Sequence, residues 1–157
     1  MLKYKILIFG ASGFIGNNLF SKFLKKKYFV TGTYNRNKKR GLIKFDLLKD
    51  NLNKLKNLNN YSHFIFCQGG NTSLDNIELN WRSEKKIYQD ETKKIISKLS
   101  KFKKKIIFIS SDAVFDGKKG NYKEKSIKNP VNFYGKFKHE VENYIIKNLQ
   151  DFLLIFL

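Results

Sequence analysis

The sequence has few of the residues that build disulfide frameworks or metal centres. Cys67 is the single cysteine, and His63 and His139 are the only histidines in 157 residues. One cysteine excludes an internal disulfide framework and suits a reducing compartment, so we expect a cytoplasmic protein. Neither histidine lies in a metal-ligand spacing, and we expect no bound metal. Cys67 ends an apolar run, which favours a small core residue over a nucleophile.

Long apolar runs are also missing. No run approaches the roughly 18 residues that a membrane-spanning helix needs, so we expect no membrane span. The apolar start of the chain is interrupted by Lys5, and it leads straight into a motif that requires a strand there, so a signal peptide is disfavoured. A hydrophobic content of 41% in 157 residues is enough for one domain with its own core.

Acidic residues are scarce, at 13 against 32 basic ones, which gives a formal net charge of +19. Such a charge by itself would favour nucleic acid or another anionic surface. However, only Arg36, Arg40 and Arg82 among the basic residues are arginine, and the lysines are spread along the chain. Base-specific contacts rely on arginine and on clustered patches. We therefore expect no nucleic-acid partner, although the positive field would attract anionic substrates such as nucleotides.

Short apolar runs alternate with longer amphipathic ones, which is typical of βαβ units and a parallel sheet. The pattern predicts strands over residues 4–9, 28–34, 42–45, 63–67, 105–109 and 152–157. It predicts helices over 14–26, from 81 to about 99, and from a cap at Asn132 to about 149. Right-handed crossovers then favour an α/β doubly wound parallel sheet of the Rossmann type, with strand order 3-2-1-4-5-6. In such a sheet, ligands bind beyond the carboxyl ends of strands 1 and 4.

The turn after the first predicted strand reads GASGFIG over residues 10–16. Gly10 permits the tight turn, Gly13 lets the backbone approach a pyrophosphate, and Gly16 allows close helix packing. The start of the following helix offers free N–H groups and a partial positive charge to phosphates. The motif therefore predicts a dinucleotide site. The residues that we expect to contact the cofactor here are Gly10, Ser12, Gly13, Phe14, Ile15 and Gly16.

The second predicted strand ends without a carboxylate. An NAD site usually places Asp or Glu there to bind the ribose 2′-hydroxyl, but no acidic residue precedes Asp46. Residues 34–40 instead read YNRNKKR, and a guanidinium would pair with a 2′-phosphate. We predict a preference for NADP(H), with Arg36 as the contact, and leave NAD(H) open. The alternative is that this loop is basic only because the whole protein is basic, and that it has no role in cofactor choice.

Tyr134 and Lys138 lie four residues apart on a predicted helix, so they share a face. With the glycine motif, this pair resembles the short-chain dehydrogenase/reductase superfamily in its extended, nucleotide-sugar-modifying branch. The resemblance implies that Tyr134 exchanges a proton with the substrate oxygen, and that Lys138 holds the cofactor ribose. A nearby ammonium favours the phenolate, so we expect a lowered pKa for Tyr134.

The segment ISSDAVFDG, residues 109–117, fills the place of the superfamily's serine or threonine. It resembles the dTDP-4-dehydrorhamnose reductase family, which implies that Ser111 orients the substrate oxygen, with Ser110 as second choice. The resemblance implies an NADP(H)-dependent oxidoreductase that reduces a 4-keto nucleotide-sugar, a step toward dTDP-rhamnose and cell-surface polysaccharide. A nucleotide-sugar epimerase or dehydratase, and a non-catalytic NADP-binding fragment or regulatory module, remain alternatives.

Other residues follow from the resemblance with less support. Asp46 matches a carboxylate near the adenine, and Gln68 and Gly69 occupy the strand end that borders the cofactor ribose. Gln89 lies near the place of a helix asparagine that supports the lysine, without matching it. Trp81 could stack on a sugar, but an interface or core position is favoured.

The resemblance covers residues 1–157 as one NADP(H)-binding domain that carries the Ser/Tyr/Lys set. The resemblance implies a further, smaller substrate domain, which we expect to be absent from this sequence. We therefore expect either a truncated form or a partner chain that completes the site, with a homodimer as a further alternative. An apolar strand at the end, residues 152–157, predicts a tendency to associate.

Overall fold

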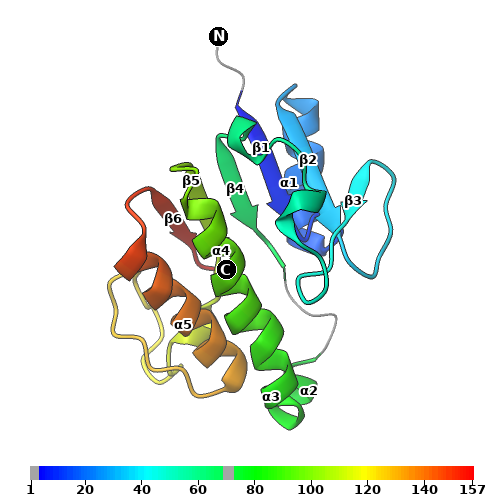
Figure 1. Ribbon diagram of the computed structural model, residues 1–157. Coiled ribbons are helices and arrows are strands. Elements are labelled where there is room, and N and C mark those ends of the chain that lie inside the picture. Colours follow the sequence, from blue (N-terminus) through cyan, green and yellow to red (C-terminus); the bar gives the residue numbers. More distant parts are fainter. Residues whose placement is uncertain (1–3, 69–72) are drawn as a thin grey trace.

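Six parallel strands form one sheet in the computed structural model, which describes residues 4–68 and 73–157 (Figure 1). The strands are β1 (Lys5–Phe9), β2 (Phe29–Tyr34), β3 (Leu42–Lys44), β4 (His63–Phe66), β5 (Lys105–Ile109) and β6 (Phe152–Ile155). Their order across the sheet is β3-β2-β1-β4-β5-β6. The predicted α/β doubly wound fold and its strand order are confirmed. The switch point lies between β1 and β4.

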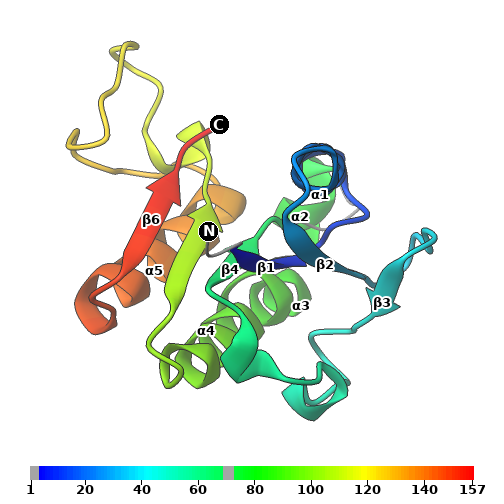
Figure 2. The ribbon, with the colours of Figure 1, turned by 90° about the horizontal axis from the view of Figure 1, so that it is seen from above.

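Helices cover both faces of the sheet. They are α1 (Phe14–Lys25), α2 (Leu74–Leu79), α3 (Trp81–Lys85), α4 (Thr92–Ser100) and α5 (Phe133–Asn148). In Figure 1, α4 and α5 lie in front of the sheet and α1 lies behind it, and Figure 2 shows the same layers from above. The three-layer arrangement follows from the strands, which are apolar on both faces.

Alternate residues of each strand supply two cores. On the α4 and α5 side, the buried strand residues are Leu7, Phe9, Phe64, Phe66, Ile106 and Phe108. They pack against Ile95, Ile96 and Leu99 of α4 and against Val141 and Ile145 of α5. On the α1 side, Ile6, Ile8 and Ile65 are buried beneath Leu19, Phe20 and Phe23. This second core is smaller, and Leu153, which lies beside Ile107 in the sheet, stays 47% exposed.

The helix predicted from residue 81 to about 99 is interrupted, which corrects the prediction. Between α3 and α4 lies the π-helical turn η3 (Lys86–Glu91), where both Tyr88 and Gln89 are buried. The Thr92 hydroxyl donates to the carbonyl oxygen of Ile87 at 2.9 Å. A π turn inserts one residue into the helical spacing, and the apolar pattern does not reveal it. The short helix α2, which Ser73 caps, was also not predicted.

Smaller differences concern the ends of the elements. The last strand was predicted over 152–157, but its ladder ends at Ile155. The stretch between β3 and β4 contains two short 3-10 turns, η1 (Leu52–Lys54) and η2 (Leu58–Asn60), and Leu52 and Leu55 are buried there. In residues 4–68 and 73–157, no helix is long and apolar enough to cross a membrane. The same residues contain no group of side chains suited to hold a metal ion.

Candidate active site

The glycine turn has the geometry that its sequence predicted. Gly10 has a φ of +80°, and a Cβ atom there would come within 2.8 Å of the Gln68 backbone. A Cβ atom on Gly16 would lie 2.3 Å from the carbonyl oxygen of Gly10, so this glycine sets how closely α1 approaches the turn. At Gly13 the surroundings are open, and only the Gly10 carbonyl oxygen comes near, at 3.5 Å. The turn can therefore admit a ligand at Gly13 but not a side chain at Gly16.

The start of α1 has donors to offer. Gly13 occupies the N-cap position, and no side chain caps the start of the helix. The first turn contains no acidic residue. The first N–H groups of a helix have no acceptors within it. Such a terminus suits a phosphate. Phe14 and Ile15 could contribute only these N–H groups, because the Phe14 side chain is exposed and neither residue lines the cleft described next.

A cleft opens at the carboxyl ends of β1, β2 and β4. Its lining contains Gly10, Ser12 and Gly13 from the turn, Tyr34 to Asn37 from the end of β2, Phe45 and Leu47 after β3, Cys67 and Gln68 after β4, and Ile87 and Tyr88 of η3. The site thus lies at the switch point of the sheet, where doubly wound folds bind their ligands. The Gly10 N–H donates to Thr33 Oγ1 at 3.2 Å, which ties the turn to β2.

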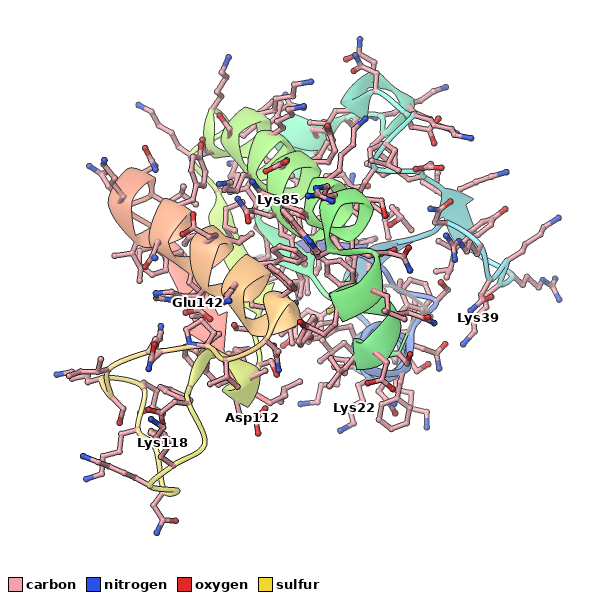
Figure 3. The ribbon with its side chains drawn as sticks, turned by 90° about the horizontal axis from the view of Figure 1, so that it is seen from below. Lys22, Lys39, Lys85, Asp112, Lys118 and Glu142 are labelled. Atoms are coloured by element: carbon pink, nitrogen blue, oxygen red, sulfur yellow. The ribbon has the colours of Figure 1, made fainter. Side chains whose placement is uncertain are left out.

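Arg36 is the cationic residue among those that line the cleft, and it lies at the end of β2. Its neighbours Lys38, Lys39 and Arg40 do not line the cleft. Figure 3 shows Lys39 in the β2–β3 loop, extending away from the body of the molecule. The structure therefore separates Arg36 from the basic loop around it, and the contact of Arg36 with a cofactor stays a prediction.

The helix α5 presents Tyr134 and Lys138 on its buried side. Asn132 caps this helix, as predicted, by accepting the Gly135 N–H at 2.7 Å. A Cβ atom on Gly135 would lie 2.1 Å from the Ala113 carbonyl oxygen. The absence of a side chain at Gly135 thus lets α5 begin directly against η4 (Asp112–Val114), the turn that follows β5.

Lys138 is only 5% exposed. Its Nζ donates to the carbonyl oxygen of Ile109 at 2.9 Å and lies 4.7 Å from the centre of the Phe108 ring. Burial lowers the pKa of Lys138 to about 8, while the nearby Cys67 and Glu142 raise it. At neutral pH Lys138 is therefore still mostly protonated, but its ammonium group loses its proton more easily than that of an exposed lysine.

Tyr134 is half-buried and makes an edge-to-face contact with Tyr88, with ring centroids 5.8 Å apart. Burial raises the pKa of Tyr134, a hydrogen bond with Ser111 opposes this, and the charge of Asp112 adds to the rise. The expectation of a lowered pKa was therefore wrong for this structure. The Lys138 Nζ points to the Ile109 carbonyl oxygen and stays 5.6 Å from the Tyr134 ring centre.

The two candidate serines differ in their surroundings. The hydroxyl of Ser110 is buried and bonds to Glu142 of α5. The Ser111 hydroxyl donates to Asp112 Oδ1 at 3.1 Å and accepts the Ala113 N–H at 3.2 Å, and a hydrogen bond with it acts to lower the pKa of Tyr134. Ser111 is therefore the serine that faces the tyrosine.

Cys67 and Gln68 connect the cleft to this group. Burial raises the pKa of Cys67 to about 12, and the charge of Lys138 opposes the rise. The Nε2 of Gln68 donates to Thr92 Oγ1 at 3.2 Å and links the segment after β4 to the start of α4. Ser111, Tyr134 and Lys138 are not among the residues that line the cleft. Tyr88 does line it and contacts the Tyr134 ring, so the Ser/Tyr/Lys group lies next to the cleft.

Two predicted contacts have less direct support. Asp46 accepts the Leu48 N–H at 2.9 Å, and its side chain does not line the cleft, although Phe45 and Leu47 on either side do. Its contact with a cofactor stays a prediction. Gly69, and Gly70 beside it, lie outside the described residues. Trp81 stacks on Phe133 with ring centroids 4.9 Å apart, which agrees with a packing position.

The sequence reasoning missed Tyr88, Glu142 and Lys128. Glu142 is fully buried and lies four residues after Lys138, so helical spacing already places it on the same face. Tyr88 reaches the site because η3 changes the helical register. No pattern in the sequence could place Lys128, which comes from a long loop and meets Glu142 only in the folded chain.

The fold, the glycine turn and the Ser111, Tyr134 and Lys138 group together define a protein of the extended short-chain dehydrogenase/reductase type. Comparison with known proteins agrees, because residues 4–156 match the RmlD substrate binding domain family. The chain belongs to that family.

Solved structures of related proteins have the same fold. A hypothetical dTDP-4-dehydrorhamnose reductase from Sulfolobus tokodaii is similar with a TM-score of 0.82 and 34% identity, over 97% of this chain and 55% of that one. The dTDP-4-dehydrorhamnose reductase of Bacillus anthracis, in complex with NADP, is similar with a TM-score of 0.81 over 99% and 54% of the two chains. At 19% identity, this second likeness shows the fold alone.

Among curated relatives, the beta subunit of methionine adenosyltransferase 2 from Bos taurus is 27% identical over 144 residues. The match covers 92% of this chain and 43% of the relative. The chain thus spans about half the length of the relatives that it matches.

Proposed function

We propose that this chain is the cofactor-binding and catalytic part of an NADP(H)-dependent reductase that acts on a 4-keto nucleotide-sugar. The observation that carries the proposal is the position of Tyr134, Lys138 and Ser111 beside a cleft built on the glycine turn. Two residues of the cleft, Cys67 and Tyr88, adjoin the group. A dinucleotide bound in the cleft would therefore have its nicotinamide end next to Tyr134.

The cleft suits a nicotinamide dinucleotide. The open space at Gly13 and the uncapped start of α1 would take the pyrophosphate, and the end of β2 would take the adenosine ribose. Arg36 would pair with a 2′-phosphate, which favours NADP(H) over NAD(H). One related structure is described as a complex with NADP. Others are described as complexes with NAD, so both cofactors occur among proteins of this fold.

When bound, NADPH would supply a hydride to the substrate carbonyl carbon. Tyr134 would donate its phenolic proton to the carbonyl oxygen, and the raised pKa of Tyr134 keeps that proton in place until it is needed. Ser111 would hold the same oxygen, since it already contacts the tyrosine. Lys138 would bind the cofactor ribose, and its charge would stabilise the phenolate that remains.

The first experiment measures cofactor binding by fluorescence titration with NADPH and NADH. We expect tighter binding of NADPH. Arg36→Gln should weaken NADPH binding by roughly 10- to 100-fold, the effect of losing a charged hydrogen bond, and leave NADH binding unchanged. Arg40→Gln is the matched control, because this arginine does not line the cleft. Tighter NADH binding by the wild-type chain would contradict the NADP(H) preference.

The second experiment follows NADPH oxidation with dTDP-4-keto-6-deoxyhexoses. Net oxidation identifies a reductase, because an epimerase regenerates its cofactor within each turnover. Tyr134→Phe should reduce kcat by roughly 10²- to 10⁴-fold, the usual contribution of a general acid. Tyr144→Phe, ten residues further along α5, is the control and should retain the rate. An unchanged rate in Tyr134→Phe would remove the tyrosine from the mechanism.

A second candidate function has one specific observation in its favour. The curated relatives are named as a subunit of methionine adenosyltransferase 2. A chain of this family could therefore bind NADP(H) and regulate a partner enzyme without turning the cofactor over. Tight NADPH binding, with no NADPH oxidation by any of the keto-sugars, would favour this function over the reductase.

A further inference from the structure

The carboxylate of Glu142 is fully buried in the middle of α5. It lies two helical turns beyond Tyr134 and one turn beyond Lys138, on the same side of the helix. A buried carboxylate without partners would be very costly, and its partners therefore reveal its role. Figure 3 shows Glu142 on the side of α5 that faces the loop following β5.

The partners of Glu142 come from separate parts of the chain. One oxygen accepts a hydrogen bond from Ser110, which is itself buried at the end of β5. The other oxygen pairs with the Nζ of Lys128 at 2.5 Å, and the side chain of Lys128 is only 12% exposed. His139 Nδ1, one turn earlier on α5, lies 3.9 Å from the same oxygen. The carboxylate therefore joins the strand end, the helix and the loop.

Ser110 and Lys128 also have contacts on the side away from Glu142. The Ser110 N–H donates to the Ile155 carbonyl oxygen of β6 at 2.7 Å, so its main chain belongs to the sheet. The Lys128 ammonium lies 4.8 Å from the centre of the Phe156 ring. The cluster thus fixes the carboxyl end of β5 relative to α5 at the residue immediately before Ser111.

We infer that Glu142 is a positioning residue, which holds Ser111 against Tyr134 by anchoring Ser110 to the helix that carries the tyrosine. The inference deepens the proposed function and rests on it, because it concerns the geometry of the same Ser/Tyr pair. Glu142 itself reaches no substrate. It acts through Ser110, one peptide unit away from the serine that contacts the tyrosine.

The test measures the contact between Ser111 and Tyr134 without substrate or cofactor. All eight tyrosines are replaced biosynthetically by 3-fluorotyrosine, whose phenol is more acidic, and titrated by ¹⁹F NMR. The loss of one resonance in Tyr134→Phe assigns the Tyr134 signal. The hydrogen bond with Ser111 lowers the pKa of Tyr134, so a displaced Ser111 should move the midpoint of this signal to higher pH.

Two variants are expected to displace Ser111. Glu142→Ala removes the whole cluster, and Ser110→Ala removes only the bond to the strand end, which keeps the test available if the first variant does not fold. Both should raise the Tyr134 midpoint, and Ser110→Ala should also reduce the kcat of an active reductase by roughly tenfold with little change in NADPH affinity.

Ser62→Ala is the matched control. Its hydroxyl bonds to the backbone of Lys5 at the opposite end of the sheet, so this variant should lose stability and retain the Tyr134 midpoint. If Ser110→Ala behaves like Ser62→Ala, with a lower melting temperature and an unchanged midpoint, Glu142 is merely structural and the inference is wrong. Failure of the proposed function would appear separately, as absent NADPH binding or oxidation in the wild-type chain.

Discussion

The Nζ of Lys138 lies 2.9 Å from the carbonyl oxygen of Ile109, a hydrogen bond that joins the middle of α5 to the last residue of β5. The lysine is buried there against the Phe108 ring, with the thiol of Cys67 nearby. An ammonium placed in such surroundings loses much of its hydration. A buried charge is therefore held in place at a cost to the stability of the domain.

This cost gives a prediction for Lys138→Met. The pKa of Lys138 is about 8 in the folded chain, below its usual 10.5. Between these two pH values the unfolded chain binds the extra proton, so the lysine's contribution to stability rises with pH across this window. At pH 7 the buried charge is destabilising, and Lys138→Met should raise the free energy of unfolding by about 1–3 kcal/mol.

Urea denaturation at pH 7 and at pH 10 measures this effect. Because the folded lysine is already neutral at pH 10, most of the difference between variant and wild type should disappear there. Lys136→Met, an exposed position on the same helix, is the control and should change little at either pH. A destabilised Lys138→Met variant at pH 7 would show that the hydrogen bond to Ile109 outweighs the burial of the charge.

The same pKa predicts how cofactor affinity depends on pH. Above about pH 8 Lys138 becomes neutral and loses a donor proton together with its charge. If it binds the cofactor ribose, NADPH affinity should fall as the pH rises from 7 to 9, with a midpoint near 8. Fluorescence titrations across this range measure it. Lys138→Met should bind weakly at every pH, and a wild-type affinity that does not vary would contradict the role of the lysine.

Two glycines of the turn should separate stability from binding. Gly16→Ala would place a Cβ atom 2.3 Å from the Gly10 carbonyl oxygen, so α1 must move away. We expect a loss of about 1–3 kcal/mol in the free energy of unfolding, as for other overpacked sites. Gly13→Ala meets open space, so the fold should keep its stability while NADPH affinity falls by roughly tenfold or more.

Thermal unfolding and NADPH titration of both variants provide the comparison. Equal stability losses at Gly13 and Gly16 would show that the turn is sterically uniform. Unchanged NADPH affinity in Gly13→Ala would place the pyrophosphate elsewhere.

Cys67 should be unreactive in the native protein. Burial raises the pKa of its thiol to about 12, so almost no thiolate exists at neutral pH. Iodoacetamide at pH 8 should label the native chain far more slowly than the urea-unfolded chain, with mass spectrometry as the measure. Rapid labelling of the native chain would indicate an activated thiol and would reopen the possibility of a nucleophile in the cleft.

Much of the fold could be predicted from periodicity. The runs around Leu7, Phe64 and Ile106 are short and apolar, as in strands buried on both faces, and the amphipathic segments between them require crossover helices. The handedness of these crossovers then leaves one strand order. The π turn escaped prediction because its extra residue, near Tyr88, changes the helical register without a compositional signal.

The parts of the candidate site that could be predicted are those that depend on residues close together in the sequence. The positive φ of Gly10 and the contact of Gly16 with the Gly10 carbonyl oxygen are local, and the spacing of Tyr134 and Lys138 places both on one face of a helix. The pKa of Tyr134 could not be predicted in this way. It depends on burial and on the direction of the lysine ammonium, and both are set by residues distant in sequence.

The sequence by itself determined the glycine turn, because the positive φ of Gly10 and the contact of Gly16 with the Gly10 carbonyl oxygen are local demands. Only the tertiary structure brings the Gln68 backbone against Gly10. The sequence also determined the strand order, through apolar periodicity and the handedness of the crossovers, and it placed Tyr134 and Lys138 on one helix face through their spacing. Only the tertiary structure decided which serine faces the tyrosine, since Ser110 and Ser111 are chemically alike and differ by their contacts with Glu142 and Tyr134. Those contacts join segments more than 20 residues apart, and no local pattern encodes them.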